Sequence, residues 1–331
     1  MDIRDYLSDA GQAVLALCSS LATKGSGEDD LQPFRLSEWN ELSSQIENSN
    51  LKNPAVLQGR SAAQLAAELE LLPQEAERIV RLLDRGGALA LELETLFSRG
   101  LWAVTRVDDL YPAKLRNTLK HQAPSILFGA GDIRLLEKGG VGVVGSRSID
   151  EAAAAFAREL GRKTAGAGLP LVSGGAKGSD QHGMAGAMEA EGTAIGALAD
   201  SLEATVRKSE IRDLLLDGRL VLLTPYAPTA GFSVGAAMGR NKLIYGLADF
   251  AVVVQSDFQT GGTWAGAVEA LKANWCPVFV RESAETPKGN TELIKLGAAP
   301  FPETELEGIS ELPDWFRHHA RAKEEQGNLF G

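Results

Sequence analysis

Residues 169–180, LPLVSGGAKGSD, place a short apolar run directly before a loop with three glycines, a lysine and an aspartate. The run has the length and character of a buried strand, and a strand that leads through such a loop into a helix is typical of βαβ units. The loop has two possible purposes. It either turns the chain sharply or holds a phosphate on its backbone amides.

Similar units repeat on both sides of this stretch. Short apolar runs alternate with helix-length amphipathic segments, which is typical of a parallel sheet covered by helices on both faces. The sequence therefore predicts an α/β fold with a Rossmann-like, doubly wound, mostly parallel sheet. Its six predicted strands are VGVVGS (141–146), LPLVSGG (169–175), TAIGALA (193–199), RLVLLTPY (219–226), FAVVVQS (250–256) and CPVFVRE (276–282).

The predicted domain organisation has three parts. Residues 1–105 show helical periodicity and no strand-like alternation, so we expect a helical N-terminal domain. Within it, residues 61–87 form a helix-turn-helix-like unit, which is either a packing module or a small DNA-binding module. Residues 106–300 form the predicted Rossmann-like core, and residues 301–331 a C-terminal extension with a mobile tail.

Composition narrows the classes of function. The net charge of −11 argues against a broad, sequence-blind grip on nucleic acid, yet it leaves room for a local basic pocket. The four histidines do not match metal-ligand spacing, and we expect neither a metal site nor a cofactor. Apolar runs are too short to cross a bilayer, and the acidic N-terminus is unlike a secretory signal, so we expect a cytoplasmic protein without membrane contact.

Candidate site residues follow from the rule that open parallel sheets bind ligands beyond the carboxyl ends of their strands. Four loops there offer amides, hydroxyls and cations, and the segment GAAMGRNKLIYGLAD is expected to place Gly239 and the two residues after it at the start of a helix. The loops fit neither the GxGxxG nor the P-loop order. The predicted DNA- or phosphate-binding residues are Gly145, Ser146, Arg147, Ser173, Gly174, Gly175, Lys177, Arg240, Asn241, Gly261, Gly262 and Thr263.

Four motifs in this order and spacing resemble the core of the DprA/Smf family of DNA-processing proteins: VVGSR, LVSGGAKGSD followed by GAM, GRNKLIYGLAD with VVV, and TGGTWAGAVEAL. The resemblance extends over residues 60–285. It implies a protein that binds single-stranded DNA, protects incoming strands in natural transformation and helps load a RecA-type recombinase. It also implies a homodimer and a binding protein rather than an enzyme, with no catalytic residues. Arg147 and Lys177 align with the basic residues of the family's DNA pocket.

The sequence also departs from the family pattern. Met184 stands where the family usually has a histidine, so no role is carried over to His182. TGG replaces the usual SG after the fifth strand, and VFVRE replaces a proline-glycine after the sixth, which suggests a divergent branch. Two further residues keep two interpretations each: Asp180 caps a helix or contacts ligand, and Trp264 belongs to the core or stacks a base.

Alternative functions stay open at this point. The stretch TGGTWAGAVE echoes the loop of phosphoribohydrolases, in which Glu269 would be the carboxylate beside a ribose, and a nucleotide-sensing defence protein is a related possibility. The C-terminal QGNLF resembles a peptide that docks on the sliding clamp, with Gln326, Leu329 and Phe330 as its anchors.

Overall fold

The computed structural model describes residues 2–23 and 31–329, with side chains described up to residue 320. The chain forms two compact units. Unit 1 consists of residues 1–116, 120–130 and 224–228, and unit 2 of residues 117–119, 131–223 and 229–331. The boundaries predicted at residues 105 and 300 stay predictions. Among the described residues, no helix is long and apolar enough to span a bilayer.

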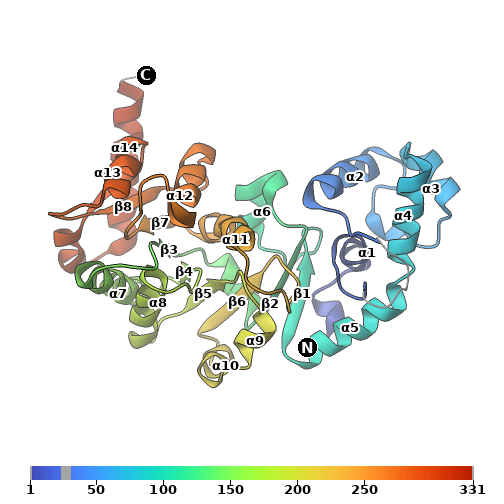
Figure 1. Cartoon of the computed structure of the whole chain (residues 1–331), viewed down its shortest axis with the longest axis horizontal. Coiled ribbons are helices and arrows are strands. Elements are labelled where there is room, and N and C mark those ends of the chain that lie inside the picture. Colours follow the sequence, from blue (N-terminus) through green and yellow to red (C-terminus); the bar gives the residue numbers. More distant parts are fainter. Residues whose placement is uncertain (1, 24–30, 330–331) are drawn as a thin grey trace. The chain divides into compact units, whose positions relative to one another are not determined.

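Unit 1 is mainly helical (Figure 1). Its helices bury spaced apolar side chains, such as Leu65 and Leu69 of one helix and Ile79 and Leu82 of the next. The unit predicted near 61–87 comprises α3 and α4; Ser61 caps α3 in a reciprocal capping box with Gln64. The elements up to residue 122 are η1 (Ile3–Asp5), α1 (Asp9–Cys18), α2 (Leu36–Asn48), η2 (Pro54–Leu57), α3 (Ala62–Leu69), α4 (Pro73–Leu83), α5 (Gly86–Ser98), β1 (Leu101–Thr105), α6 (Ala113–Leu119) and η3 (Lys120–Gln122).

The expectation of helix throughout residues 1–105 is wrong at its end, because Leu101–Thr105 is the strand β1. It pairs antiparallel with β2 (Ile126–Ala130), Leu101 lying opposite Ala130 and Thr105 opposite Ile126. All residues of both strands are buried. A strand buried on both faces shows no alternation of polar and apolar residues, so its periodicity cannot be told from that of a buried helix segment.

Unit 2 contains a parallel sheet in the strand order β6-β5-β4-β3-β7-β8-β9. The six predicted strands are confirmed, and with them the Rossmann-like, doubly wound fold. The elements are η4 (Ile133–Glu137), β3 (Val141–Val144), α7 (Glu151–Gly166), β4 (Leu171–Ser173), α8 (Ser179–Glu189), β5 (Ala194–Ala197), α9 (Leu202–Val206), α10 (Ser209–Leu216), β6 (Leu220–Thr224), α11 (Val234–Leu247), β7 (Phe250–Val253), α12 (Gly261–Ala273), β8 (Val278–Glu282), α13 (Lys288–Lys295), β9 (Ala299–Pro302), η5 (Glu303–Gly308) and α14 (Leu312–Leu329).

Helices cover this sheet on two faces (Figure 1). Val141 and Val143 of β3 belong to a core that includes Phe156 of α7, Ala187 of α8 and Phe316 of α14. The intervening Gly142 faces the other way, where a Cβ would meet Ala248 at the end of α11. Successive strand residues point to opposite faces, so the alternation along β3 assigns α7, α8 and α14 to one layer and α11 to the other.

The structure adds a strand, β9, that is not among the six predicted strands; as an edge strand it tolerates Pro300 and Pro302, because part of its backbone needs no ladder partner. One expectation about α11 needs correction. Gly239, Arg240 and Asn241 do not begin a helix. Helix α11 starts at Val234, since the Ser233 hydroxyl accepts the Ala236 N–H at 3.0 Å and caps it there.

The ends of β7 and β8 are tied together by Asn290 of α13, which is fully buried. Its Oδ1 accepts the Ser256 N–H at 2.8 Å, and its Nδ2 donates to the carbonyls of Val254 and Arg281 at 3.1 and 2.9 Å. This side chain thus hydrogen-bonds three backbone groups at the ends of the two strands. It determines where the loop after β7 begins.

We expect Asn290→Ala to lower the free energy of unfolding by about 2–4 kcal/mol, because it leaves these buried backbone groups unsatisfied. The shift of the urea midpoint measures the loss. Asn117→Ala, at an exposed position of α6, serves as the control and should change stability by less than about 0.5 kcal/mol. Equal effects of the two substitutions would contradict the assigned role.

Candidate functional site

A pocket of about 680 Å³ opens in unit 2 beyond the carboxyl ends of β3 and β7. These neighbouring strands lead in opposite directions through the sheet, since β4, β5 and β6 follow on the side of β3, and β8 and β9 on the side of β7. Such a switch point leaves a crevice in which open α/β sheets bind ligands. Four chain segments contribute: the loop after β3, the loop and first turn of α8, helix α11 with the residues before it, and the loop into α12.

The loop after β3 brings three of the predicted binding residues, Gly145, Ser146 and Arg147, to the pocket. Its backbone is held on both sides: the Ser146 N–H donates to Gln255 O at 2.8 Å, and the Ser146 carbonyl accepts the Ser179 N–H at 3.3 Å. Arg147 itself is exposed, and its guanidinium lies 5.3 Å from the centre of the Phe232 ring. A backbone held by hydrogen bonds therefore presents an exposed cation to the pocket.

The glycine-rich loop after β4 plays a different part from the one expected. Ser173 is buried and donates its hydroxyl to Val143 O at 2.7 Å, so it joins two strands. The buried carboxylate of Asp180 accepts the N–H groups of Gly174 and Ala176 at 3.1 and 3.3 Å. Neither Ser173 nor Gly174 lines the pocket; nor do Gly175 and Lys177, which are both exposed.

Arg240 reaches the pocket from the middle of α11 and is only 6% exposed. Its guanidinium occupies the space that a Cβ at Gly174 would need, which explains the glycine there. Asn241, the next residue, donates from Nδ2 to Gly262 O at 2.9 Å and so fixes the first turn of α12. The structure thus brings both residues to the site, although from within a helix.

Helix α12 starts at the pocket. Thr260 is its N-cap, and the predicted binding residues Gly261, Gly262 and Thr263 line the pocket. The first N–H groups of a helix have no partners within it and carry the positive end of its dipole. Together with Arg147 and Arg240, they make this part of the pocket suited to an anion such as a phosphate.

Asp180 lines the same pocket as Arg147, Arg240 and the first turn of α12. Burial raises the pKa of its carboxyl group to about 6, and Arg240 together with the hydrogen bonds from the Ala176 and Gly174 amides opposes the rise. The carboxyl accepts amides of the loop before α8 and lines the base of the pocket. Of the two interpretations of Asp180, capping of its own helix is therefore wrong; its bonds run to the preceding loop.

Several lining residues were missed by sequence reasoning. Phe232, Val234 and Met238 are exposed apolar side chains in the pocket, and Tyr245 lies buried at its back. Ser233 as an N-cap would have indicated that α11 begins here. Trp264 is half-buried and packs edge-to-face on Phe258 at 5.1 Å, outside the pocket lining. His182 faces another groove, beside α7.

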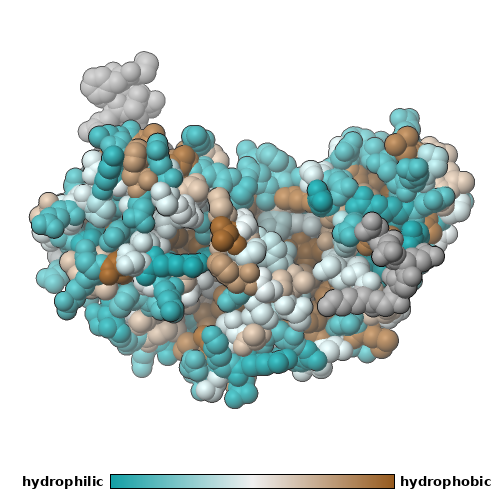
Figure 2. Space-filling view, in the orientation of Figure 1, coloured by the Kyte–Doolittle hydropathy of each residue, from teal (hydrophilic) through white to brown (hydrophobic). Residues whose placement is uncertain are grey.

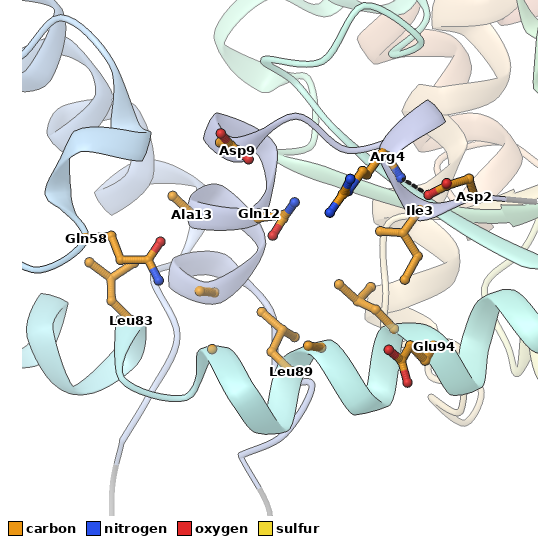
Figure 3. Close-up of a pocket in the computed structure, with 14 residues that line it drawn as sticks. Asp2, Ile3, Arg4, Asp9, Gln12, Ala13, Gln58, Leu83, Leu89 and Glu94 are labelled. Carbon is orange, nitrogen blue, oxygen red and sulfur yellow. Dashed lines mark hydrogen bonds between the residues drawn. The ribbon is translucent and has the colours of Figure 1, made fainter.

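A second pocket, of about 430 Å³, lies in unit 1 (Figure 3). Arg4 and Gln12 face each other across it above Leu89 of α5, and carboxylates of Asp2, Asp9 and Glu94 line it as well. The acidic side chains outnumber the single arginine. This excess of negative charge disfavours a phosphate. In the unit 2 pocket, by contrast, Arg147 and Arg240 balance Asp180 and Asp257, and the first amides of α12 add positive character, so that pocket is the candidate site.

We expect Asp180→Asn to remove one component of the pH dependence of stability. The pKa of about 6 lies above the ~3.9 of an unfolded chain, so the folded wild type binds this proton more tightly and loses the resulting stability as the pH rises through 6. Between pH 7 and pH 5 the wild type should gain about 1 kcal/mol relative to the variant. Urea midpoints at both pH values measure it, and parallel profiles would contradict the assignment.

The chain is similar in sequence to one known protein family. The sequence model of a family described as DNA recombination-mediator protein A matches residues 102–312. The DNA processing protein DprA of Bacillus subtilis is 28% identical over 210 residues, which cover 62% of this chain and 69% of that protein.

Solved structures agree on the fold. The X-ray structure of DNA processing protein A from Streptococcus pneumoniae has a TM-score of 0.62 and 23% identity, covering 82% of this chain and 95% of that one. A structure of DNA processing protein A from Helicobacter pylori, described by its single-stranded DNA binding mode, has a TM-score of 0.51 and 24% identity, covering 62% and 93%. Since the family model spans more than half of the sequence, the chain belongs to the DNA recombination-mediator protein A family.

Proposed function

We propose that this protein binds single-stranded DNA through the pocket at the β3–β7 switch point and acts in DNA processing. One observation carries the proposal: Arg147, Arg240 and the first-turn amides of α12 converge on one pocket of an otherwise acidic protein. This arrangement suits a few phosphates rather than a long duplex. Family membership and the DNA-binding relative from Helicobacter pylori support it.

We propose different roles for the predicted site residues, according to whether they line the pocket. Gly145, Ser146, Arg147, Arg240, Asn241, Gly261, Gly262 and Thr263 are proposed to face the bound strand, because they line the pocket. Lys177 is exposed on the adjoining loop and is proposed to meet a phosphate further along. Ser173 and Gly174 are proposed to act indirectly, through the strand pairing and the position of Arg240.

The biological context is proposed from the family resemblance. Protection of single strands, assistance in loading a RecA-type recombinase, a role in transformation or recombination, and a homodimer all belong to that resemblance. A cytoplasmic location follows from the same role. A comparison of recombinase filament growth on strands with and without the protein tests the loading step.

A phosphoribohydrolase-like enzyme is less well supported. Glu269, the carboxylate that it would need, forms an ion pair with Lys242 at 2.9 Å and does not line the pocket. A nucleotide-sensing defence protein would use the same pocket, and no feature of its lining favours it over a DNA strand. Incubation with nucleoside monophosphates should release no free base.

We expect Arg147→Ala to weaken binding of a single-stranded oligonucleotide about tenfold and to reduce the slope of log affinity against log salt by about 0.7, because one phosphate contact is lost. Adding Lys177→Ala should lower both further. Fluorescence anisotropy over a salt series measures the two quantities. Arg212→Ala, an exposed arginine of α10 outside the pocket, removes the same charge and should change neither. An Arg147 variant with unchanged affinity would refute the assignment.

We also propose that the C-terminal peptide docks on the sliding clamp. Gln326 and Leu329 lie in the last turns of α14, where side chains are not described, and Phe330 lies outside the described residues. Deletion of residues 326–331 should abolish capture of the protein by immobilised clamp. Persistent capture after the deletion, or none by the intact protein, would refute this proposal.

A further inference from the structure

The candidate pocket has an apolar wall that phosphate binding does not use. Phe232, Val234 and Met238, from the segment before α11 and its first turns, line the pocket and are 53%, 70% and 48% exposed. Figure 2 shows hydrophobic surface at the place that α11 occupies in Figure 1. Soluble proteins seldom leave neighbouring large apolar side chains in water without a purpose.

The apolar side chains and the cationic side chains of the pocket come together at Phe232 and Arg147. The Arg147 guanidinium lies 5.3 Å from the centre of the Phe232 ring, within the range of a cation–π contact. The ring keeps about half of its surface exposed, so the arginine covers only part of it. A ligand whose anionic group rests on Arg147 therefore has a planar apolar surface directly beside it.

This juxtaposition defines the chemistry of the occupant. Arg147 and the first-turn amides of α12 favour an anionic group beside them, and the adjoining aromatic ring favours a planar group that loses little by leaving water. A nucleotide unit offers both, as a phosphate and a base. The volume of about 680 Å³ lies in the ~300–1,000 Å³ range of sites for molecules of that size.

We propose that Phe232 is the platform on which one unpaired base of the bound strand stacks, while the neighbouring phosphate rests on Arg147 and the first-turn amides of α12. Val234 and Met238 extend the apolar surface around that base. This inference rests on the proposed function and adds a specificity-determining residue to it. Phosphate contacts alone are common to single and double strands, whereas a base can reach Phe232 only when it is unpaired.

The experiment compares two ligands with the same number of phosphates: an oligo(dT) strand of 20 nucleotides and a fully abasic strand of the same length. Phe232→Ala should weaken binding of oligo(dT) at least fivefold and leave the affinity for the abasic strand unchanged, because only the former has bases to stack. Phe232→Trp should retain oligo(dT) binding. Arg147→Ala should weaken both ligands.

Leu216→Ala is the matched control. Leu216 is 78% exposed on α10 of the same unit, outside the pocket, so its removal deletes a comparable exposed apolar side chain and should affect neither ligand. Circular dichroism and the urea midpoint establish that each variant is folded; the exposure of Phe232 means that its removal leaves no internal cavity.

The outcomes separate this inference from the proposed function. If the wild type binds oligo(dT) and Phe232→Ala binds it equally well, the stacking platform is refuted and DNA binding stands. If Phe232→Ala weakens both ligands to the same extent, the ring acts by positioning Arg147 and the platform is also refuted. If the wild type binds neither ligand, the proposed function fails first.

Discussion

A buried carboxylate beside a buried guanidinium governs the arrangement of this site. Asp180 and Arg240 are 4% and 6% exposed, and burial of either charge without compensation would cost several kcal/mol. Asp180 accepts two amides of the loop after β4, and Arg240 opposes the rise of the pKa of that carboxyl and fills the space over Gly174 in the same loop. These contacts join the loop, α8 and α11. That coupling gives the pocket a preformed floor.

The sequence predicted the strands whose position follows from the local pattern of apolar residues. It did not predict features that depend on contacts between distant parts of the chain. The six strands were predictable because each is a short apolar run in a regular alternation with helix-length amphipathic segments. Strands β1 and β2 were not, since they stand outside that alternation, and periodicity alone does not distinguish a short buried strand from a buried helix segment. β9 escaped because of its prolines, which only an edge position permits.

The same limit applies to individual residues. Ser173 was grouped with ligand contacts because its loop position suggested them, whereas its hydroxyl bonds the neighbouring strand, a pairing that sequence does not reveal. Arg240 was predicted to lie at the site, and it does, although its helix begins earlier than expected. Leu243 and Leu247 follow it by three and seven residues, so all three side chains lie on the same, buried face of α11. Phe232 was missed because nothing in the sequence shows that it stands beside Arg147.

The first turn of α11 differs in character from the rest of the pocket. Residues 231–235 are all exposed, whereas Leu243 to Leu247 of the same helix are buried. Few buried contacts hold that turn, so it can unwind and re-form at a free-energy cost well below that of opening the sheet. The turn that carries Phe232 and Val234 can therefore change its position, whereas the part of the pocket around Asp180 and Arg240 is held by buried contacts. Under the proposed stacking on Phe232, a turn that adjusts in this way would fit bases of different size.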